Sequence, residues 1–224
     1  MKGAIVTGSS KGIGYATVKL LLEKGFKVVG WSRSKTEIEH ENFHHLRVDV
    51  STYMDVESAV KESDKILNGE IEILVNNAGF GKQEYLMESD PKNFDAMFAT
   101  NVNGLYYCTR LIAPLMAKNK KGHIFNIASI AGTMGIESLS GYCASKWAVR
   151  GFSHSIFKEL RKDGIKVSCI NPGSVNTHFF DDFENIEADD SMMSPVDIAK
   201  SMWFAYETSD NFHVVEMEMR PLKR

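Results

Sequence analysis

The chain of 224 residues has few cysteines, little net charge and no long apolar run. Its three cysteines, Cys108, Cys143 and Cys169, are odd in number and scattered, which argues against a disulfide framework and favours free thiols in a reducing cytoplasm. A net charge of -3 gives no electrostatic reason to expect nucleic acid or an anionic membrane as a partner. No run approaches the roughly 18 apolar residues of a membrane span.

Metal binding is also not expected from the sequence. His40, His44 and His45 are close together, but no matching cysteine or carboxylate cluster accompanies them. We therefore interpret them as surface or strand-edge histidines and predict no metal site.

What the chain does contain is a regular alternation of predicted strands and helices. Seven apolar runs predict strands, at residues 4–7, 27–31, 44–50, 71–75, 123–128, 165–170 and 213–219. Helical periodicity and helix-start signals predict helices at residues 13–24, 54–67, 91–118, 142–162 and 195–206. This alternation predicts an α/β fold: one Rossmann-type domain over residues 1–224, with a doubly wound parallel sheet of about seven strands and helices on both faces.

A glycine-rich turn joins the first predicted strand to the first predicted helix. Its glycines are Gly8, Gly12 and Gly14, a spacing that departs from the usual G-x-G-x-x-G. Bare backbone and a helix N-terminus together form a phosphate site, so the turn favours a dinucleotide. The alternative is an ordinary glycine-rich turn between a strand and a helix.

The end of the second predicted strand indicates which dinucleotide is bound. NAD sites have a carboxylate there for the ribose 2′-hydroxyl, whereas NADP sites need cations for a 2′-phosphate. This chain has Ser32-Arg33-Ser34 and no acid before Glu37, and Lys11 lies in the glycine turn. Unless both cations are merely surface residues, they favour NADP(H) over NAD(H).

Tyr142 and Lys146 are four residues apart, which puts them on one face of a helix. A nearby ammonium lowers the pKa of a phenol from its free value of roughly 10 and makes it a usable acid or base. The same offset occurs in two other pairs, which we interpret as solvated helix faces: Tyr15–Lys19 and Tyr106–Arg110. Tyr142 differs because Ser129 ends a buried strand shortly before it, and ligands lie at strand ends in such sheets.

Three other segments of the sequence are candidate parts of a ligand site, and two of them allow a second interpretation. Asn76-Asn77-Ala78-Gly79 follows a strand and suits a turn that lies close to a ligand. Asn101 interrupts a predicted helix and is either a surface residue or a polar group with a purpose. Residues 177–194 lack periodicity and mix aromatic with acidic side chains, which suits either a lid over a substrate or a disordered acidic loop.

In order along the chain, these motifs resemble the short-chain dehydrogenase/reductase family over nearly the full length. The matching motifs are Thr7-Gly8-x-x-x-Gly12-Ile13-Gly14, Asn76-Asn77-Ala78-Gly79, Asn101, Ser129, Tyr142-x-x-x-Lys146 and Pro172-Gly173-x-Val175-x-Thr177. The chain is similar to compact members related to the 3-oxoacyl-carrier-protein reductases. It lacks their Gly-Gly tail, and its segment between Thr177 and Pro195 is short.

The resemblance implies a role for each matching residue. Tyr142 is expected to be the general acid or base, Lys146 to lower its pKa and hold the nicotinamide ribose, Ser129 to bind the substrate oxygen, and Asn101 to position a relay water. The phosphates are expected at Gly8, Ser10, Lys11, Gly12, Ile13 and Gly14, and the 2′-phosphate at Lys11 and Arg33. The remaining cofactor contacts are expected at Asp49 and Val50 for adenine, at Asn77, Ala78 and Gly79, and at Pro172, Gly173, Val175 and Thr177.

The expected function is NADPH-dependent reduction of a ketone or aldehyde. A cofactor-binding sensor or scaffold is the first alternative, and an epimerase or dehydratase on the same frame is the second. A homodimer or homotetramer is expected through the helices at 90–118 and 142–162. The substrate is a small carbonyl compound whose identity the sequence leaves open; candidate pocket residues are Phe80, Met134, Trp147, Phe179 and Phe180.

Overall fold

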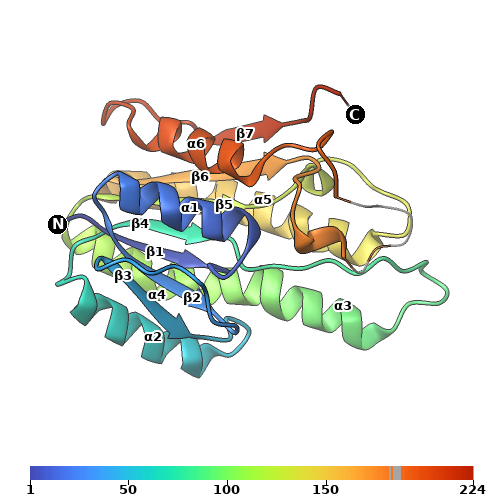
Figure 1. Cartoon of the computed structure of the whole chain (residues 1–224), viewed down its shortest axis with the longest axis horizontal. Helices are drawn as coiled ribbons and strands as arrows, with labels where there is room; N and C mark the ends of the chain where they lie inside the picture. Colours follow the sequence, from blue (N-terminus) through green and yellow to red (C-terminus); the bar gives the residue numbers. More distant parts are fainter. Residues whose placement is uncertain (182, 184–187, 224) are drawn as a thin grey trace.

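Seven strands form one parallel sheet in the computed structural model, which describes residues 1–181, 183 and 188–223 (Figure 1). The strands are β1 (Gly3–Thr7), β2 (Lys27–Ser32), β3 (Phe43–Arg47), β4 (Ile71–Asn76), β5 (Gly122–Ile127), β6 (Ile165–Pro172) and β7 (Glu216–Met219). Their order is β3-β2-β1-β4-β5-β6-β7, with every neighbouring pair parallel. Because the order reverses between β1 and β4, the predicted doubly wound fold is confirmed.

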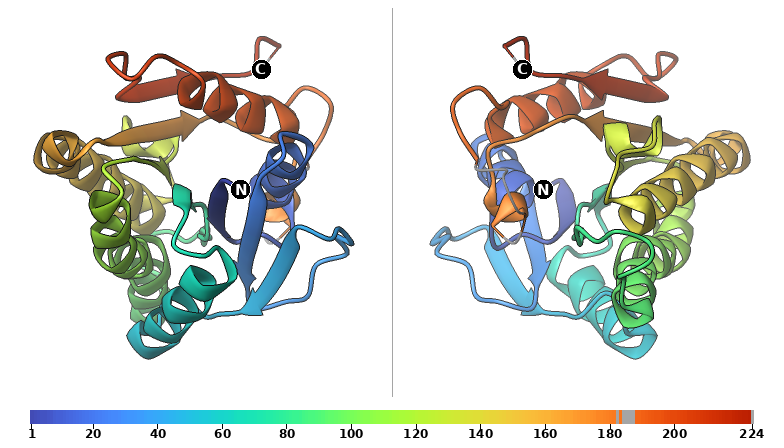
Figure 2. Two further views of the ribbon diagram at one scale, coloured as in Figure 1. Left: turned by 90° about the vertical axis from the view of Figure 1, so that its left-hand side faces the viewer. Right: turned by 90° about the vertical axis from the view of Figure 1, so that its right-hand side faces the viewer.

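Helices cover both faces of the sheet (Figure 2). On one face, α1 (Gly12–Glu23) and α6 (Pro195–Tyr206) pack with β1, β4 and β5 in one apolar cluster. On the other face, α2 (Tyr53–Ile66), α4 (Leu105–Lys118) and α5 (Ser140–Leu160) contribute to a second cluster. The five central strands, β2, β1, β4, β5 and β6, are largely buried between these layers, which explains their apolar runs, whereas the edge strands β3 and β7 are partly exposed.

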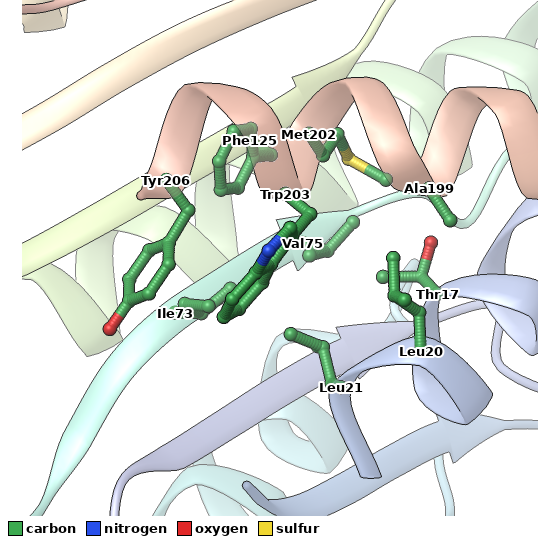
Figure 3. Close-up of a pocket in the computed structure, with 10 residues that line it drawn as sticks. All are labelled: Thr17, Leu20, Leu21, Ile73, Val75, Phe125, Ala199, Met202, Trp203 and Tyr206. Atoms are coloured by element: carbon green, nitrogen blue, oxygen red, sulfur yellow. The ribbon is translucent and has the colours of Figure 1, made fainter. Parts of the chain in front are cut away.

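The face covered by α1 and α6 is closely packed (Figure 3). Figure 3 shows Leu21 of α1 and Trp203 of α6 converging over Ile73 and Val75 of β4. The cavity between them is about 10 Å³, roughly the space of one water molecule. This cavity is therefore too small for a cofactor or substrate.

Two helix starts follow the local signals that predicted them. At α3 (Pro91–Phe98), the Asp90 carboxylate accepts a hydrogen bond from Lys92 N at 2.9 Å. At α6, Ser194 and Asp197 form a capping box in front of Pro195.

Two strands are shorter than predicted by three residues at one end, and the predicted helical region at 91–118 contains a segment of another helix type. The third strand ends at Arg47 instead of Val50, because Asp49 turns the chain by accepting hydrogen bonds from Ser51 N and Oγ. The last strand begins at Glu216 instead of His213, whose ring accepts a hydrogen bond from Val167 N in place of a ladder bond. The helix predicted at 91–118 is split by a π-helical segment, Ala99–Gly104.

No helix among the described residues is long and apolar enough to cross a membrane. The three cysteines are buried with free thiols. No group of three or more potential metal ligands occurs in the part of the chain that the structure describes.

Candidate active site

A cavity of about 730 Å³ opens at the carboxyl ends of the strands. It is lined by Ser129, Tyr142 and Lys146 and by most of the residues expected to bind the cofactor. Those residues are Gly8, Ser10, Lys11, Gly12, Ile13, Arg33, Asp49, Val50, Asn77, Ala78, Gly79, Pro172, Gly173, Val175 and Thr177. Gly14 and Asn101 do not line the cavity, and both lie directly behind its wall.

The glycine turn forms one end of the cavity. Gly8 and Gly12 have φ angles of 66° and 60°, a conformation that L side chains rarely adopt. Asn77 holds the turn from the next strand, since its Nδ2 donates to Thr7 O at 3.0 Å and to Gly8 O at 3.2 Å. The first turn of α1 carries no acidic side chain and no side-chain cap, so its N–H groups are available to an anion.

Gly14, in the first turn of α1, packs directly against this glycine turn. A Cβ atom at Gly14 would lie 2.2 Å from Gly8 O and 2.6 Å from Asn77 Nδ2. The absence of a side chain at Gly14 therefore lets α1 pack against the turn that lines the cavity.

The end of β2 and the glycine turn each provide a cation, and the end of β2 also provides hydroxyl groups. Arg33 and Lys11 are exposed and line the same cavity, together with Ser32 and Ser34. The nearest acid in the lining is Asp49. Partial burial acts to raise the pKa of Asp49, but hydrogen bonds from Ser51 and the charge of Arg33 outweigh it and lower the pKa.

Tyr142 and Ser129 meet deep in the cavity. Ser129 follows β5, accepts a hydrogen bond from Ala131 N at 3.1 Å and donates to Pro172 O at 3.5 Å. Burial raises the pKa of the Tyr142 phenol well above its ordinary value; a hydrogen bond with Ser129 opposes this rise, and Cys143 adds to it. The phenol is therefore protonated at neutral pH.

Lys146 lies one turn along α5 from Tyr142, as their spacing predicted. Its Nζ is 5.6 Å from the centre of the Tyr142 ring and donates to Ile127 O at 2.8 Å. Burial lowers the pKa of Lys146 to about 8, although Cys169 acts in the opposite direction. Desolvation of the phenol is the largest influence on the pKa of Tyr142 in this arrangement, and it acts against the lowering expected from Lys146.

Asn101 lies in the π-helical segment, and its side chain explains the break in the helix. Its Oδ1 accepts from Phe80 N at 3.0 Å, while its Nδ2 donates to Phe80 O at 2.9 Å and to Ser145 Oγ at 3.0 Å. Ser145 in turn donates to Tyr142 O at 2.7 Å. Asn101 thus connects the loop after β4 to the helix that carries Tyr142, and it is a buried polar group instead of a surface residue.

Loops after β4 and β6 complete the wall. Thr7 Oγ1 accepts hydrogen bonds from Asn77 N and Ala78 N, both at 3.0 Å, which fixes the turn after β4. After β6, Gly173 N donates to Met219 O at 2.7 Å, so the short last strand holds this loop in place. Thr177 lies opposite Gly12, whose added Cβ would be 3.3 Å from Thr177 Cγ2.

The segment predicted as either a lid or a loop is only partly described. Residues 182 and 184–187 lie outside the described residues. In the described part, Val175 and Met193 form a parallel bridge, and His178–Phe180 forms one 3-10 turn. Phe179, Phe180 and Phe183 from this segment line the cavity.

The apolar end of the cavity contains three of the five side chains proposed for it. Phe80, Phe179 and Phe180 line the cavity, whereas Met134 and Trp147 do not and are about half exposed. Gly81, Ile136, Leu139 and Phe183 also contribute to the lining. Sequence reasoning did not identify these four as pocket residues, because they come from irregular segments with no periodicity to place them.

Comparison with known proteins gives a consistent family. The model of the family described as short chain dehydrogenase matches residues 2–187. An uncharacterised oxidoreductase of Staphylococcus aureus (strain MRSA252) is 31% identical over 228 residues, covering 99% of this chain and 97% of that protein.

Solved structures agree along the whole chain. The closed form of serine dehydrogenase complexed with NADP+ has a TM-score of 0.90 at 26% identity, covering 99% of this chain and 96% of the other. The 3-ketoacyl-(acyl-carrier-protein) reductase of Brucella melitensis complexed with NADH has a TM-score of 0.91 at 27% identity, covering 99% and 98%.

Proposed function

This chain belongs to the short-chain dehydrogenase family, and we propose that it is an NADPH-dependent reductase that converts a ketone or aldehyde to an alcohol. The observation that carries this proposal is the meeting of Ser129, Tyr142 and Lys146 in the cavity that also contains the glycine turn. A protein that only sensed or stored the cofactor would not need a buried proton donor there.

The cavity fits a nicotinamide dinucleotide. The positive φ angles of Gly8 and Gly12 and the uncapped start of α1 suit a pyrophosphate. Lys11 and Arg33 suit a 2′-phosphate, and the end of β2 lacks the carboxylate that a free ribose hydroxyl requires. NADP(H) is therefore preferred over NAD(H), although one of the two solved structures compared above contains NADP+ and the other contains NADH. A bound nicotinamide supplies the hydride for the reaction.

Tyr142 supplies the proton. The phenol is protonated at neutral pH, so it can donate a proton to a carbonyl oxygen as negative charge develops there. The Ser129 hydroxyl, which lies within hydrogen-bonding reach of Tyr142, stabilises the same oxygen.

Lys146 and Asn101 would assist this proton transfer without donating the proton themselves. Lys146 provides a buried positive charge and would hold the nicotinamide ribose. Asn101 uses both polar atoms of its side chain to fix Phe80 and Ser145, and it would position the water that relays protons to Lys146.

We also propose that the enzyme is a cytoplasmic homodimer or homotetramer. Tyr106 of α4 and Trp147 of α5 are both nearly half exposed on neighbouring helices, and aromatic side chains of this kind are enriched at interfaces. The three free thiols suit a reducing compartment.

The test measures NADPH oxidation with a panel of ketones, aldehydes, quinones and acyl thioesters. Tyr142→Phe is expected to lower kcat by about 100-fold to 10,000-fold, the usual contribution of general acid catalysis, while NADPH binding is retained. Tyr15→Phe is the matched control, because Lys19 lies 5.9 Å from the Tyr15 ring and this pair lies outside the cavity lining. Equal turnover by Tyr142→Phe and wild type would refute the mechanism, and NADPH binding without turnover of any carbonyl would favour a sensor.

A further inference from the structure

The substrate end of the cavity is built around a cluster of phenylalanine rings next to Tyr142. The centre of the Phe179 ring is 5.2 Å from that of Tyr142, 5.2 Å from Phe180 and 5.1 Å from Phe183. Phe180 and Phe183 meet edge to face, with their centres 5.6 Å apart. The proton donor therefore faces aromatic surface on the side where a substrate's substituents would lie.

Gly81 makes this arrangement possible. A Cβ atom at Gly81 would lie 2.9 Å from Phe179 Cζ, 3.2 Å from Tyr142 Cδ2 and 3.3 Å from Phe183 Cζ. Any side chain there would push the rings away from Tyr142. The absence of a side chain at residue 81 therefore allows these rings to pack closely against Tyr142 and form one aromatic wall of the cavity.

The same end of the cavity offers no free cation to a carboxylate. Among the described lining residues, Lys11 and Arg33 lie at the cofactor end, and Lys146 already donates to Ile127 O. His178 is exposed and paired with Asp181. The sequence places no lysine or arginine at positions 182 and 184–187.

We propose that the substrate is an uncharged carbonyl compound with an aromatic or similarly flat apolar group next to the reacting carbonyl. This proposal rests on the reductase function proposed above. The carbonyl oxygen lies at Tyr142 and Ser129, and the ring of the substrate packs against the Phe179 and Phe180 rings that line the cavity. The carbonyl carbon gains the hydride of NADPH, the oxygen gains the proton of Tyr142, and NADP+ is released. A carboxylate on the substrate would be desolvated there without a partner, which is costly.

The experiment compares kcat/KM for four related substrates with saturating NADPH. Methyl benzoylformate and benzoylformate differ in charge, while methyl pyruvate and pyruvate repeat that comparison without the ring. We expect methyl benzoylformate to exceed benzoylformate by about 100-fold or more, and to exceed methyl pyruvate by at least about 10-fold. Benzoylformate reduced as well as its ester, or methyl pyruvate reduced as well as methyl benzoylformate, would overturn the proposal.

Variants at Gly81 and Phe179 test the aromatic cluster itself. Gly81→Ala is expected to lower kcat/KM for methyl benzoylformate by about 10-fold or more and that for methyl pyruvate much less, because the ring clashes with the displaced phenylalanines. Gly135→Ala is the control, since nothing lies within 4 Å of a Cβ at that position. If Gly81→Ala does not fold, Phe179→Leu is expected to reduce the preference for the aromatic ester by removing its stacking partner. An unchanged preference in the folded variant would overturn the proposal.

The outcome also separates this inference from the function on which it rests. Turnover that depends on Tyr142 but occurs only with acyl thioesters or aliphatic carbonyls would retain the reductase and overturn the aromatic substrate. If no carbonyl compound is turned over in a way that depends on Tyr142, both the reductase function and the aromatic substrate are overturned.

Discussion

Lys146 gives a quantitative test of the buried active site. Its side chain is 5% exposed, and burial lowers its pKa from 10.5 to about 8. At about 1.4 kcal/mol per pH unit, this difference corresponds to a cost of about 3 kcal/mol for keeping the ammonium charged in the folded protein. Lys146→Met removes both the charge and its titration.

The sign of the effect follows from the protons that each state binds. Between pH 8 and 10.5 the unfolded chain keeps a proton on Lys146 that the folded chain has lost, so the stability of the wild type rises with pH across this window. The methionine variant lacks this rise. Its stability relative to wild type is therefore expected to fall by about 2 kcal/mol between pH 7 and pH 9.5.

Urea unfolding of both proteins at several pH values measures this difference, because contributions from the other titrating groups cancel. Lys158→Met is the control, since Lys158 lies exposed near the end of the same helix. A difference between Lys146→Met and wild type that stays constant from pH 7 to 9.5 would refute the reasoning from desolvation.

Three further changes test other parts of the site. Arg33→Asp is expected to raise KM for NADPH by about 10-fold or more and that for NADH little, because it replaces a 2′-phosphate partner with a repelling carboxylate; equal effects in steady-state assays with both cofactors would contradict this. Gly14→Ala is expected to destabilise the protein by about 1–3 kcal/mol in urea unfolding, because its Cβ would lie 2.2 Å from Gly8 O, whereas Gly151→Ala meets no atom within 4 Å and should be tolerated. Asn101→Leu is expected to leave Ser145 and Phe80 without their hydrogen-bond partner. Steady-state assays are expected to show a larger fall in kcat than in the affinity for NADPH. Wild-type turnover by this variant would argue against the bridging role of Asn101.

Local signals were sufficient to predict the sheet and to place Tyr142 and Lys146 side by side. Strands in this fold are short buried runs bounded by glycine or polar residues, and Tyr142 and Lys146 needed only helical spacing to share one face of α5. Errors arose where side chains replace backbone partners. Asp49 ends β3 early, and the His213 ring takes the place of a ladder bond before β7. Such bonds depend on tertiary neighbours, so no periodicity could reveal them.

Asn101 illustrates an intermediate case. Because asparagine has a low helix propensity, its presence inside a predicted helix indicated that its side chain has a specific role there. The reason lies in two segments distant in sequence, the loop at Phe80 and the helix at Ser145. The sequence identified the residue, but only the fold could supply its partners.

The protonation state of Tyr142 depends on distant residues in the same way. Spacing alone suggested that Lys146 would lower the pKa of Tyr142, which would favour a phenolate base. Phe179 and Gly81 instead lie against the Tyr142 ring, and desolvation of the phenol is the largest influence on its pKa, which it raises. The aromatic surface that we propose for the substrate thus also borders the proton donor, and a protonated phenol is the state in which reduction of a carbonyl begins.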